Sequence, residues 1–350
     1  MMSYFYTNEI VFKGHPDKVC DQISDALLDA YLEQDKDSRC GIEVVGGKGK
    51  IFVTGEVTSN AKVNVADVVN YVLDDVGYSK NYEIIDNIGK QSHDIAQGVD
   101  IGGAGDQGMM FGYACKDTES QIPLAMEILQ ELSMYYNNLR KMDDRFLPDG
   151  KAQITGCYDN NHKLRYIKDF TISYQNTEIQ RDQTDKIIKD YCIKLCHQYF
   201  MAIENFHINP TGKFLIGGFE GDAGLTGRKI CVDNYHSFVN VGGGAFSGKD
   251  PTKVDRSAAY KARQIAREVL ENYEEMSLNW VKVQLSYTIG ISEPMAIYIT
   301  SDKGDISVPN ILYEECKPQN IINDLKLKDV KYYRTAQFGH FGLGGFTWEK

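Results

Sequence analysis

Residues 42–77 read IEVVGGKGKIFVTGEVTSNAKVNVADVVNYVLDDVG. The part from 42 to 58 forms two strand-like runs around Gly46-Gly47-Lys48-Gly49, which predicts a hairpin. The part from 63 to 76 has helical spacing and stops at Gly77, a residue that commonly ends helices. The stretch therefore predicts a sheet with a helix packed against it.

The same order of elements recurs along the chain. We expect helices at residues 16–35, 122–141, 182–202 and 252–273. We expect a second hairpin at 151–174, and further strands at 213–216, 229–233, 281–289 and 295–300. This recurrence predicts an α+β protein of three similar domains, each a β-sheet with helices on one face. We place these domains at residues 1–98, 99–217 and 218–350, with interleaved segments.

Length and charge limit the class of protein. The chain has 350 residues with 38 Lys and Arg against 49 Asp and Glu, a formal net charge of −11. The length predicts two or three domains, and the acidic balance argues against nucleic-acid binding driven by overall charge. No stretch approaches the roughly 18–20 apolar residues of a membrane span. Residues 1–18 lack the apolar core of a signal peptide, so we expect a cytoplasmic protein.

The cysteines fit a reducing compartment. Eight are scattered along the chain without a C-x-x-C pair, so we expect free thiols. Cys192 and Cys196 stand four residues apart in an apolar helical stripe, and we place them in the core rather than on a metal.

Glycine gathers at residues 102–108, 217–222 and 242–250. The third cluster contains G-x-x-x-x-G-K over residues 243–249, but Asp250 replaces the Ser or Thr that holds magnesium in nucleotide hydrolases of the P-loop class. We therefore predict a polyphosphate cradle without the P-loop fold. Asp250 is the expected cap and Pro251 the expected first residue of the following helix, whose N-terminus suits an anion. Residues 213–263 hold eight basic and five acidic residues, a local charge of +3.

Residues 14–18 read GHPDK and place a histidine and a carboxylate at the start of a predicted helix. Structurally, His15 can cap a loop and Asp17 can complement the helix dipole. Chemically, Asp17 is an oxygen ligand for Mg²⁺, and His15 is a donor to a leaving oxygen. Asp255 can supply another carboxylate for Mg²⁺ bound to phosphates.

Long strings of this sequence resemble the S-adenosylmethionine synthetase (methionine adenosyltransferase) family. The resemblance rests on residues 14–18 with 21–25 (DQISD), 103–108 (GAGDQG) and 242–256 (GGGAFSGKDPTKVDR). It extends to residues 209–212, 221–229 and 339–342, and so covers nearly the whole chain. The resemblance implies the three-domain fold of this family.

The resemblance also implies a reaction in two steps. The sulfur of L-methionine attacks C5′ of ATP and displaces tripolyphosphate, which is then hydrolysed with water to diphosphate and phosphate. It implies Mg²⁺, two ions per site, and K⁺ as cofactors. It further implies a homodimer with the site at the subunit interface, which can pair into a tetramer. The acidic charge and the lack of a membrane span predict no nucleic acid or membrane partner.

Site residues follow from the resemblance position by position. Catalytic roles fall to His15, Lys151, Arg228 and Lys249. The ATP site comprises His15, Asp149, Lys151, Lys213, Phe214, Asp222, Arg228, Lys229, Ala245 and Lys249, with Phe214 as the adenine stacker. The methionine site comprises Glu56, Gln97, Asp106, Asp222 and Lys253. Asp17 and Asp255 are the implied Mg²⁺ ligands, and Glu43 contributes to the K⁺ site.

Three departures from the family pattern stand out. Residues 101–104 replace a longer charged stretch that acts as a lid in the family, which predicts altered turnover or product inhibition. Lys13 stands where the family usually has an acidic residue, and Asn8 where it has a serine. A changed charge beside His15 can shift metal or substrate preference.

Two other kinds of protein fit parts of the pattern. One is a different ATP-dependent enzyme, such as a tripolyphosphatase or kinase, which would use the same cradle without consuming methionine. The other is a regulatory homologue without activity. The charged residues of the implied site are retained, which favours an enzyme.

Overall fold

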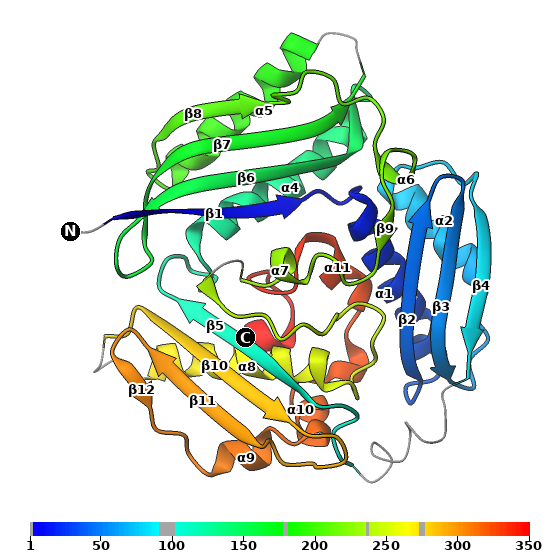
Figure 1. The fold of residues 1–350 in the computed structure, drawn as a ribbon, viewed down its shortest axis with the longest axis vertical. Coiled ribbons are helices and arrows are strands. Elements are labelled where there is room, and N and C mark those ends of the chain that lie inside the picture. The colour runs from blue at the N-terminus through cyan, green and yellow to red at the C-terminus, as the bar shows by residue number, and fades with distance from the viewer. Residues whose placement is uncertain (1–2, 91–101, 178–180, 236–237, 273–276) are drawn as a thin grey trace.

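The computed structural model describes residues 3–90, 102–177, 181–235, 238–272 and 277–350, and this part of the chain forms three four-stranded sheets (Figure 1). The strand orders are β4-β3-β2-β9, β1-β6-β7-β8 and β12-β11-β10-β5. Helices pack against each sheet, so the expected α+β architecture of three sheet-and-helix layers is confirmed.

The first sheet contains the hairpin of residues 42–58. Its strands are β2 (Arg39–Gly47), β3 (Lys50–Thr58), β4 (Glu83–Gly89) and the short β9 (Gly224–Leu225). Helix α1 (Pro16–Gln34) packs on β2 and β9, and α2 (Val65–Val76) packs beside α1. Gly77 ends α2 in the left-handed conformation at φ 92°, as its position predicts.

The second sheet pairs the start of the chain with its middle. Strand β1 (Tyr4–Val11) lies antiparallel to β6 (Phe146–Tyr158), followed by β7 (Leu164–Asn176) and β8 (Ile203–Ile208). Helices α4 (Leu124–Met142) and α5 (Arg181–Gln198) supply the apolar side chains that pack beneath this sheet. Cys192 and Cys196 are buried there as free thiols, as predicted.

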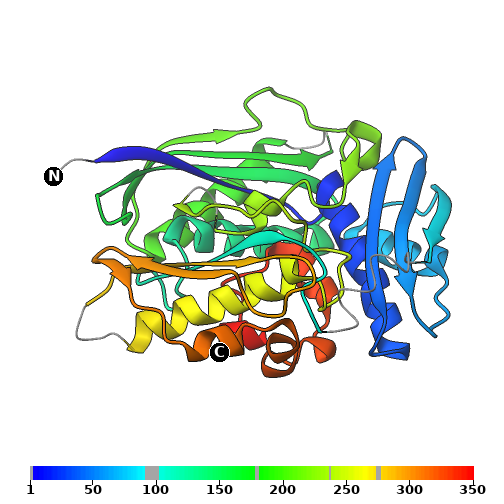
Figure 2. The same ribbon diagram turned by 60° about the horizontal axis from the view of Figure 1, so that its bottom comes forward.

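The third sheet contains β5 (Gly108–Cys115), β10 (Trp280–Tyr287), β11 (Ala296–Ser301) and β12 (Gly304–Ile306). Helix α8 (Val254–Asn272) packs along one face of this sheet, against β5 and β10 (Figure 2). Two short helices, α9 (Ile311–Glu315) and α10 (Pro318–Asp324), contact each other, and α10 also contacts α8. Two others contact elements of the other layers: α7 (Ile230–Asp233) contacts β1, and α11 (Thr335–Phe338) contacts α1 and α4.

Strand pairing crosses the expected domain borders. Strand β1 joins the sheet of β6, β5 joins the sheet of β10, and β9 joins the sheet of β2. Each sheet therefore draws strands from distant parts of the chain. The division at residues 98 and 217 stays a prediction.

Three local expectations are wrong. Residues 213–216 form no strand, and residues 230–233 form the helical turn α7 instead of a strand. Helix α8 begins at Val254, so Asp250 is not its cap and Pro251 is not its first residue. The Asp250 carboxylate instead accepts hydrogen bonds from the Cys40 amide at 2.7 Å and the Thr252 amide at 2.9 Å, which holds the chain in a turn before the helix. Within the described residues, no helix is long and apolar enough to cross a bilayer.

Candidate functional site

Helix α1 begins at a histidine. His15 is its N-cap, Pro16 is its first residue, and the Asp17 amide donates to His15 Nδ1 at 3.2 Å. Because Nδ1 accepts this bond, the neutral ring carries its proton on Nε2. His15 therefore caps helix α1, and this bond leaves Nε2 as the ring nitrogen that can donate a proton or a hydrogen bond.

His15 also lines a cavity of about 290 Å³. The walls come from three separate parts of the chain: the start of α1, the middle of β6 and the segment around α6 (Gly218–Gly221). The lining residues are His15, Pro16, Asp149, Gly150, Lys151, Phe214, Ile216, Gly217, Gly221 and Asp222. Five predicted ATP-site residues thus share one cavity, although the sequence separates them widely.

Two cations gather around Asp17, next to this cavity. Lys229 Nζ lies 2.6 Å from Asp17 Oδ2, and Arg228 Nη1 lies 3.6 Å from Asp17 Oδ1. Burial lowers the pKa of His15 to about 4, and the positive charge of Lys229 adds to this effect. His15 is therefore neutral at neutral pH and can donate a hydrogen bond through Nε2 without carrying a charge.

The rim of the cavity contains further polar groups. Lys151 Nζ lies 2.6 Å from Glu9 Oε2 on the neighbouring strand β1. Burial raises the pKa of Asp149 to about 6, while Asp149 Oδ2 accepts the Gly218 amide at 2.8 Å. Asp149 thereby holds one wall of the cavity in place. Asp222 is exposed and accepts the Ala223 amide at 2.8 Å.

The predicted phosphate loop forms a second charged group. Lys249 Nζ lies 2.5 Å from Asp255 Oδ2. A Cβ atom at residue 244 would lie 2.2 Å from Asp255 Cγ, so the close approach of loop and carboxylate requires Gly244. Lys253 Nζ lies 2.6 Å from Asp250 Oδ1.

The two charged groups touch through Gly227 and Ala245. Gly227 has φ 81°, and a Cβ atom there would lie 2.6 Å from Ala245 Cβ. The segment that carries Arg228 and Lys229 therefore packs directly on the loop that carries Lys249. This contact brings Lys249 of the third glycine cluster and the two cations that follow the second cluster to one region of the molecule.

Sequence reasoning identified Asp17 only as a metal ligand and missed that a row of carboxylates holds these segments in place. Asp17, Asp21, Asp25 and Asp29 recur every four residues along α1, and we call them the α1 carboxylate row. They accept, in order, the amides of Leu225 at 2.9 Å, Gly227 at 2.8 Å, Gly248 at 2.9 Å and Tyr332 at 2.8 Å. Like charges at this spacing repel on an exposed helix, so their repetition was a readable signal for buried partners.

Other predicted residues lie outside these groups. Glu43 and Glu56 are exposed on β2 and β3, and Asp106 is exposed before β5. Gln97 lies outside the described residues. Lys213 is exposed next to Phe214.

The two charged groups each contain a carboxylate, Asp17 in one and Asp255 in the other, that could ligate Mg²⁺. Among the described residues, no three His, Cys, Asp or Glu side chains converge on a point where they could hold a metal. Asp17 and Asp255 can each offer carboxylate oxygen, which is a typical arrangement for Mg²⁺ that takes its other ligands from substrate phosphates and water. A Mg²⁺ ion at either carboxylate would therefore need phosphate or water oxygens as further ligands.

Lys13 and Asn8, two of the departures from the family pattern, have defined partners in the structure, whereas residue 101 of the shortened stretch lies outside the described residues. Lys13 is buried and its ammonium forms an ion pair with Asp75, so its charge is compensated, and neither residue lines the cavity. Asn8 is buried on β1 and donates to the Tyr158 hydroxyl at 2.8 Å. Ala104 is fixed by two backbone bonds to the turn at residues 290 and 291, at 2.8 and 3.0 Å.

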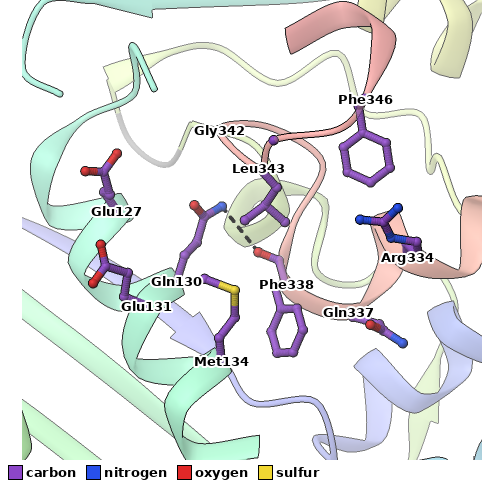
Figure 3. A pocket seen from close by; sticks show the side chains of 11 residues that line it. Glu127, Gln130, Glu131, Met134, Arg334, Gln337, Phe338, Gly342, Leu343 and Phe346 are labelled. Carbon is purple, nitrogen blue, oxygen red and sulfur yellow. Dashed lines mark hydrogen bonds between the residues drawn. The ribbon is translucent and has the colours of Figure 1, made fainter. Parts of the chain in front are cut away.

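A larger cavity of about 450 Å³ lies between α4 and the C-terminal segment. Figure 3 shows Glu127 and Glu131 on one side of it and Arg334 and Phe346 on the other. Gln130 donates to the Phe338 carbonyl at 3.3 Å across its wall. This cavity contains none of the predicted site residues, so the chemistry of the lining and not the volume distinguishes the candidate site.

The fold is an α+β fold of three sheets that exchange strands along the chain. Its candidate site is a cavity lined by His15, next to Arg228 and Lys229, which both contact Asp17. These features define a three-sheet α+β protein suited to an anionic ligand. Comparison with known proteins extends this class. The family models described as S-adenosylmethionine synthetase N-terminal, central and C-terminal domains match residues 3–95, 101–214 and 216–350. The chain belongs to the S-adenosylmethionine synthetase family.

Curated relatives resemble this chain along nearly its whole length. An S-adenosylmethionine synthase of Clostridium tetani is 40% identical over 375 residues, covering 97% of this chain and 95% of the relative. Those of Finegoldia magna and Helicobacter pylori are each 41% identical, covering 100% and 99% of this chain and 97% and 96% of the relatives.

Proposed function

We propose that this protein synthesises S-adenosylmethionine from ATP, L-methionine and water, and releases phosphate and diphosphate. The observation that carries the proposal is the convergence of His15, Lys151 and Phe214 on one cavity beside Arg228 and Lys229. The names of the curated relatives support the same activity. Members of this activity class are methionine adenosyltransferases.

The first step transfers the adenosyl group. The thioether sulfur of methionine donates a lone pair to C5′, and the C5′–O bond breaks with its electrons going to the tripolyphosphate. A thioether carries no proton, so this step needs alignment rather than a general base. The neutral His15 ring donates from Nε2 to the leaving oxygen, which stabilises the charge that develops there.

The leaving tripolyphosphate needs positive charge. Arg228, Lys229 and Lys249 are the cations we assign to it, with Lys151 at the rim of the cavity. Each lysine now pairs with a carboxylate, so binding of phosphate exchanges one anionic partner for another. In the second step, water attacks a phosphorus of the held tripolyphosphate, and a P–O bond breaks to leave diphosphate and phosphate.

Mg²⁺, when bound, neutralises phosphate charge and orients the chain of phosphates. We assign Asp17 and Asp255 to two Mg²⁺ ions and Glu43 to K⁺, with phosphate and water oxygens as the remaining ligands. Adenine stacks on Phe214, and Asp149, Lys213, Asp222 and Ala245 complete the ATP site. Glu56, Gln97, Asp106, Asp222 and Lys253 bind methionine.

We propose that the complete site forms in a homodimer, which can pair further into a tetramer. Large apolar side chains are exposed on strands of all three sheets, including Phe5, Val45, Met109 and Tyr298 at 41–52% exposure. A second copy that covers these faces would bury them and bring Glu43 and Glu56 into a site. The free cysteines support a place in the cytoplasm.

The proposal is tested by incubating the purified protein with ATP, L-methionine, Mg²⁺ and K⁺. We expect S-adenosylmethionine, detected by its mass, in a one-to-one ratio with diphosphate and with phosphate. A parallel reaction without methionine distinguishes the alternatives. Phosphate release that does not depend on methionine, with no sulfonium product, would instead identify a phosphohydrolase that uses the same cavity.

A further inference from the structure

Arg256 has no assigned role, yet its side chain is wholly buried at the start of α8. Its guanidinium faces the Asp25 carboxylate in a two-point ion pair, with Nη1 2.7 Å from Oδ1 and Nη2 2.8 Å from Oδ2. The remaining donors reach the Tyr260 hydroxyl at 3.1 Å and the Thr335 hydroxyl at 3.1 Å. Every part of the guanidinium is therefore engaged.

The ion pair of Arg256 and Asp25 also holds the backbone of the predicted phosphate loop, residues 242–250. Asp25 Oδ1 accepts the Gly248 amide at 2.9 Å, and Arg256 Nη1 donates to the Lys249 carbonyl at 3.0 Å. Asp25 and Arg256 thus bind two adjacent residues of the loop, Asp25 through the Gly248 amide and Arg256 through the Lys249 carbonyl. The backbone from which the Lys249 side chain extends is fixed on both sides.

We propose that Arg256 and Asp25 are positioning residues that aim the Lys249 ammonium at the leaving phosphate chain. The inference rests on the proposed role of Lys249 in phosphate binding. A buried ion pair is weak support for stability alone, because desolvation of both charges offsets much of their attraction. A fixed geometry for Lys249 gives the pair a function that two apolar side chains could not supply.

Lysine in place of Arg256 separates the two roles of this residue, which are to compensate the charge of Asp25 and to position the loop backbone at Lys249. It keeps one positive charge beside Asp25, so the protein is expected to fold. It lacks the planar fork, so one ammonium cannot make the two-point pair and hold the Lys249 carbonyl together. The substitution therefore loosens the loop without leaving a buried carboxylate unpaired.

Arg263 is a matched control on the same helix. It is also wholly buried, it contacts Glu349 with its nearest donor at 2.7 Å, and it also donates to backbone carbonyls, including that of Tyr113 at 2.6 Å. None of its described contacts is with the phosphate loop. Arg263→Lys should therefore reproduce any general cost of replacing a buried arginine in α8.

The experiment compares wild type, Arg256→Lys and Arg263→Lys by three measurements: thermal melting, steady-state kinetics with ATP, and tripolyphosphate affinity by calorimetry with Mg²⁺. We expect both variants to melt at lower temperature. Only Arg256→Lys should bind tripolyphosphate about tenfold more weakly and lose kcat, as expected when a catalytic group is misplaced. Asp25→Glu, which shifts the carboxylate outward, should show the same selective loss.

Equal kinetic constants and equal tripolyphosphate affinity for the two arginine variants would overturn the inference and leave Arg256 a purely structural residue. The calorimetric measurement does not require methionine or turnover. A wild-type protein that binds tripolyphosphate but makes no sulfonium product would therefore overturn the proposed function, while the difference between the variants still decides the role of Arg256.

Discussion

Lys229 Nζ lies 2.6 Å from Asp17 Oδ2, and this ion pair joins the segment after β9 to the first turn of α1. The other oxygen of Asp17 accepts the Leu225 amide at 2.9 Å. The carboxylate that we assign to Mg²⁺ is thus occupied by a lysine that we assign to phosphate. Binding of Mg²⁺ with ATP should release Lys229 from Asp17 and turn it toward the phosphates.

Replacing Asp17 by Asn should weaken Mg²⁺ activation while preserving the fold. Asparagine can still accept the Leu225 amide, but it removes the negative charge that attracts the metal. We expect the Mg²⁺ concentration for half-maximal activity to rise about tenfold or more. Asp37→Asn, at an exposed aspartate on the surface, is the control. A Mg²⁺ activation curve that does not move would remove Asp17 from the metal site.

Lys249→Ala should lose most activity and remain folded. The ammonium is partly exposed and pairs only with Asp255 among the described residues, and the Asp255 side chain keeps 16% exposure, so the substitution leaves no fully buried charge. We expect kcat to fall about 10²- to 10³-fold, as for removal of a group that stabilises transition-state charge. Lys50→Ala, which breaks an exposed pair with Glu83, should leave kcat unchanged. Activity of Lys249→Ala equal to wild type would refute the phosphate role.

Asp149→Asn should change the pH dependence of stability. The pKa of Asp149 is raised from 3.8 to about 6, so the folded protein binds more protons than the unfolded chain between these values. The stability that comes from this group is present below pH 3.8 and is lost as the pH rises through 6. Asparagine keeps an acceptor for the Gly218 amide and cannot ionise.

The variant should therefore exceed wild type in free energy of unfolding at pH 8, by up to about 3 kcal/mol, and show little gain at pH 3.5. Urea denaturation at the two pH values measures this difference. A gain that is the same at both values would show that burial does not raise the pKa of this carboxyl.

Lys13→Met should reduce stability without changing the kinetics. The Lys13 ammonium is buried against Asp75, and the same carboxylate accepts the Tyr333 hydroxyl at 2.6 Å. We expect the free energy of unfolding to fall by about 1.5–3 kcal/mol, the usual range for a hydrogen bond to a charged group. Lys141→Met tests the exposed partner of Asp75, 3.6 Å away, and should cost less than about 1 kcal/mol. A changed KM for ATP in Lys13→Met would instead support an influence on the site.

Local pattern in the sequence predicts much of this fold. The hairpin of β2 and β3 and helices α1, α2 and α4 follow from apolar spacing and from Gly77 and Pro16, because neighbouring residues alone determine those signals. The pairing of β1 with β6 and of β5 with β10 could not be predicted this way. No local signal indicates which distant strand will complete a sheet.

The candidate site shows the same division between features set by local sequence and features set by long-range contacts. The GHPDK stretch identified His15 and Asp17 from sequence, the third glycine cluster identified Lys249, and the family resemblance identified Arg228. The partners of these residues depend on tertiary contacts: Lys229 pairs with Asp17, and Lys249 with Asp255. The false strand at 229–233 has the same origin, since the Asp233 amide bonds to the Lys229 carbonyl at 2.8 Å and closes a helical turn.

The pairing of β1 with β6 also constrains how the protein is made. Asn8 meets its Tyr158 partner 150 positions later in the sequence, so β1 leaves the ribosome with no sheet to join until much more of the chain has been translated. During that interval its unpaired edge and the exposed Phe5 are open to other chains. Synthesis at high expression levels should therefore be the stage most prone to aggregation, and a chaperone that shields this strand should raise the yield of native enzyme.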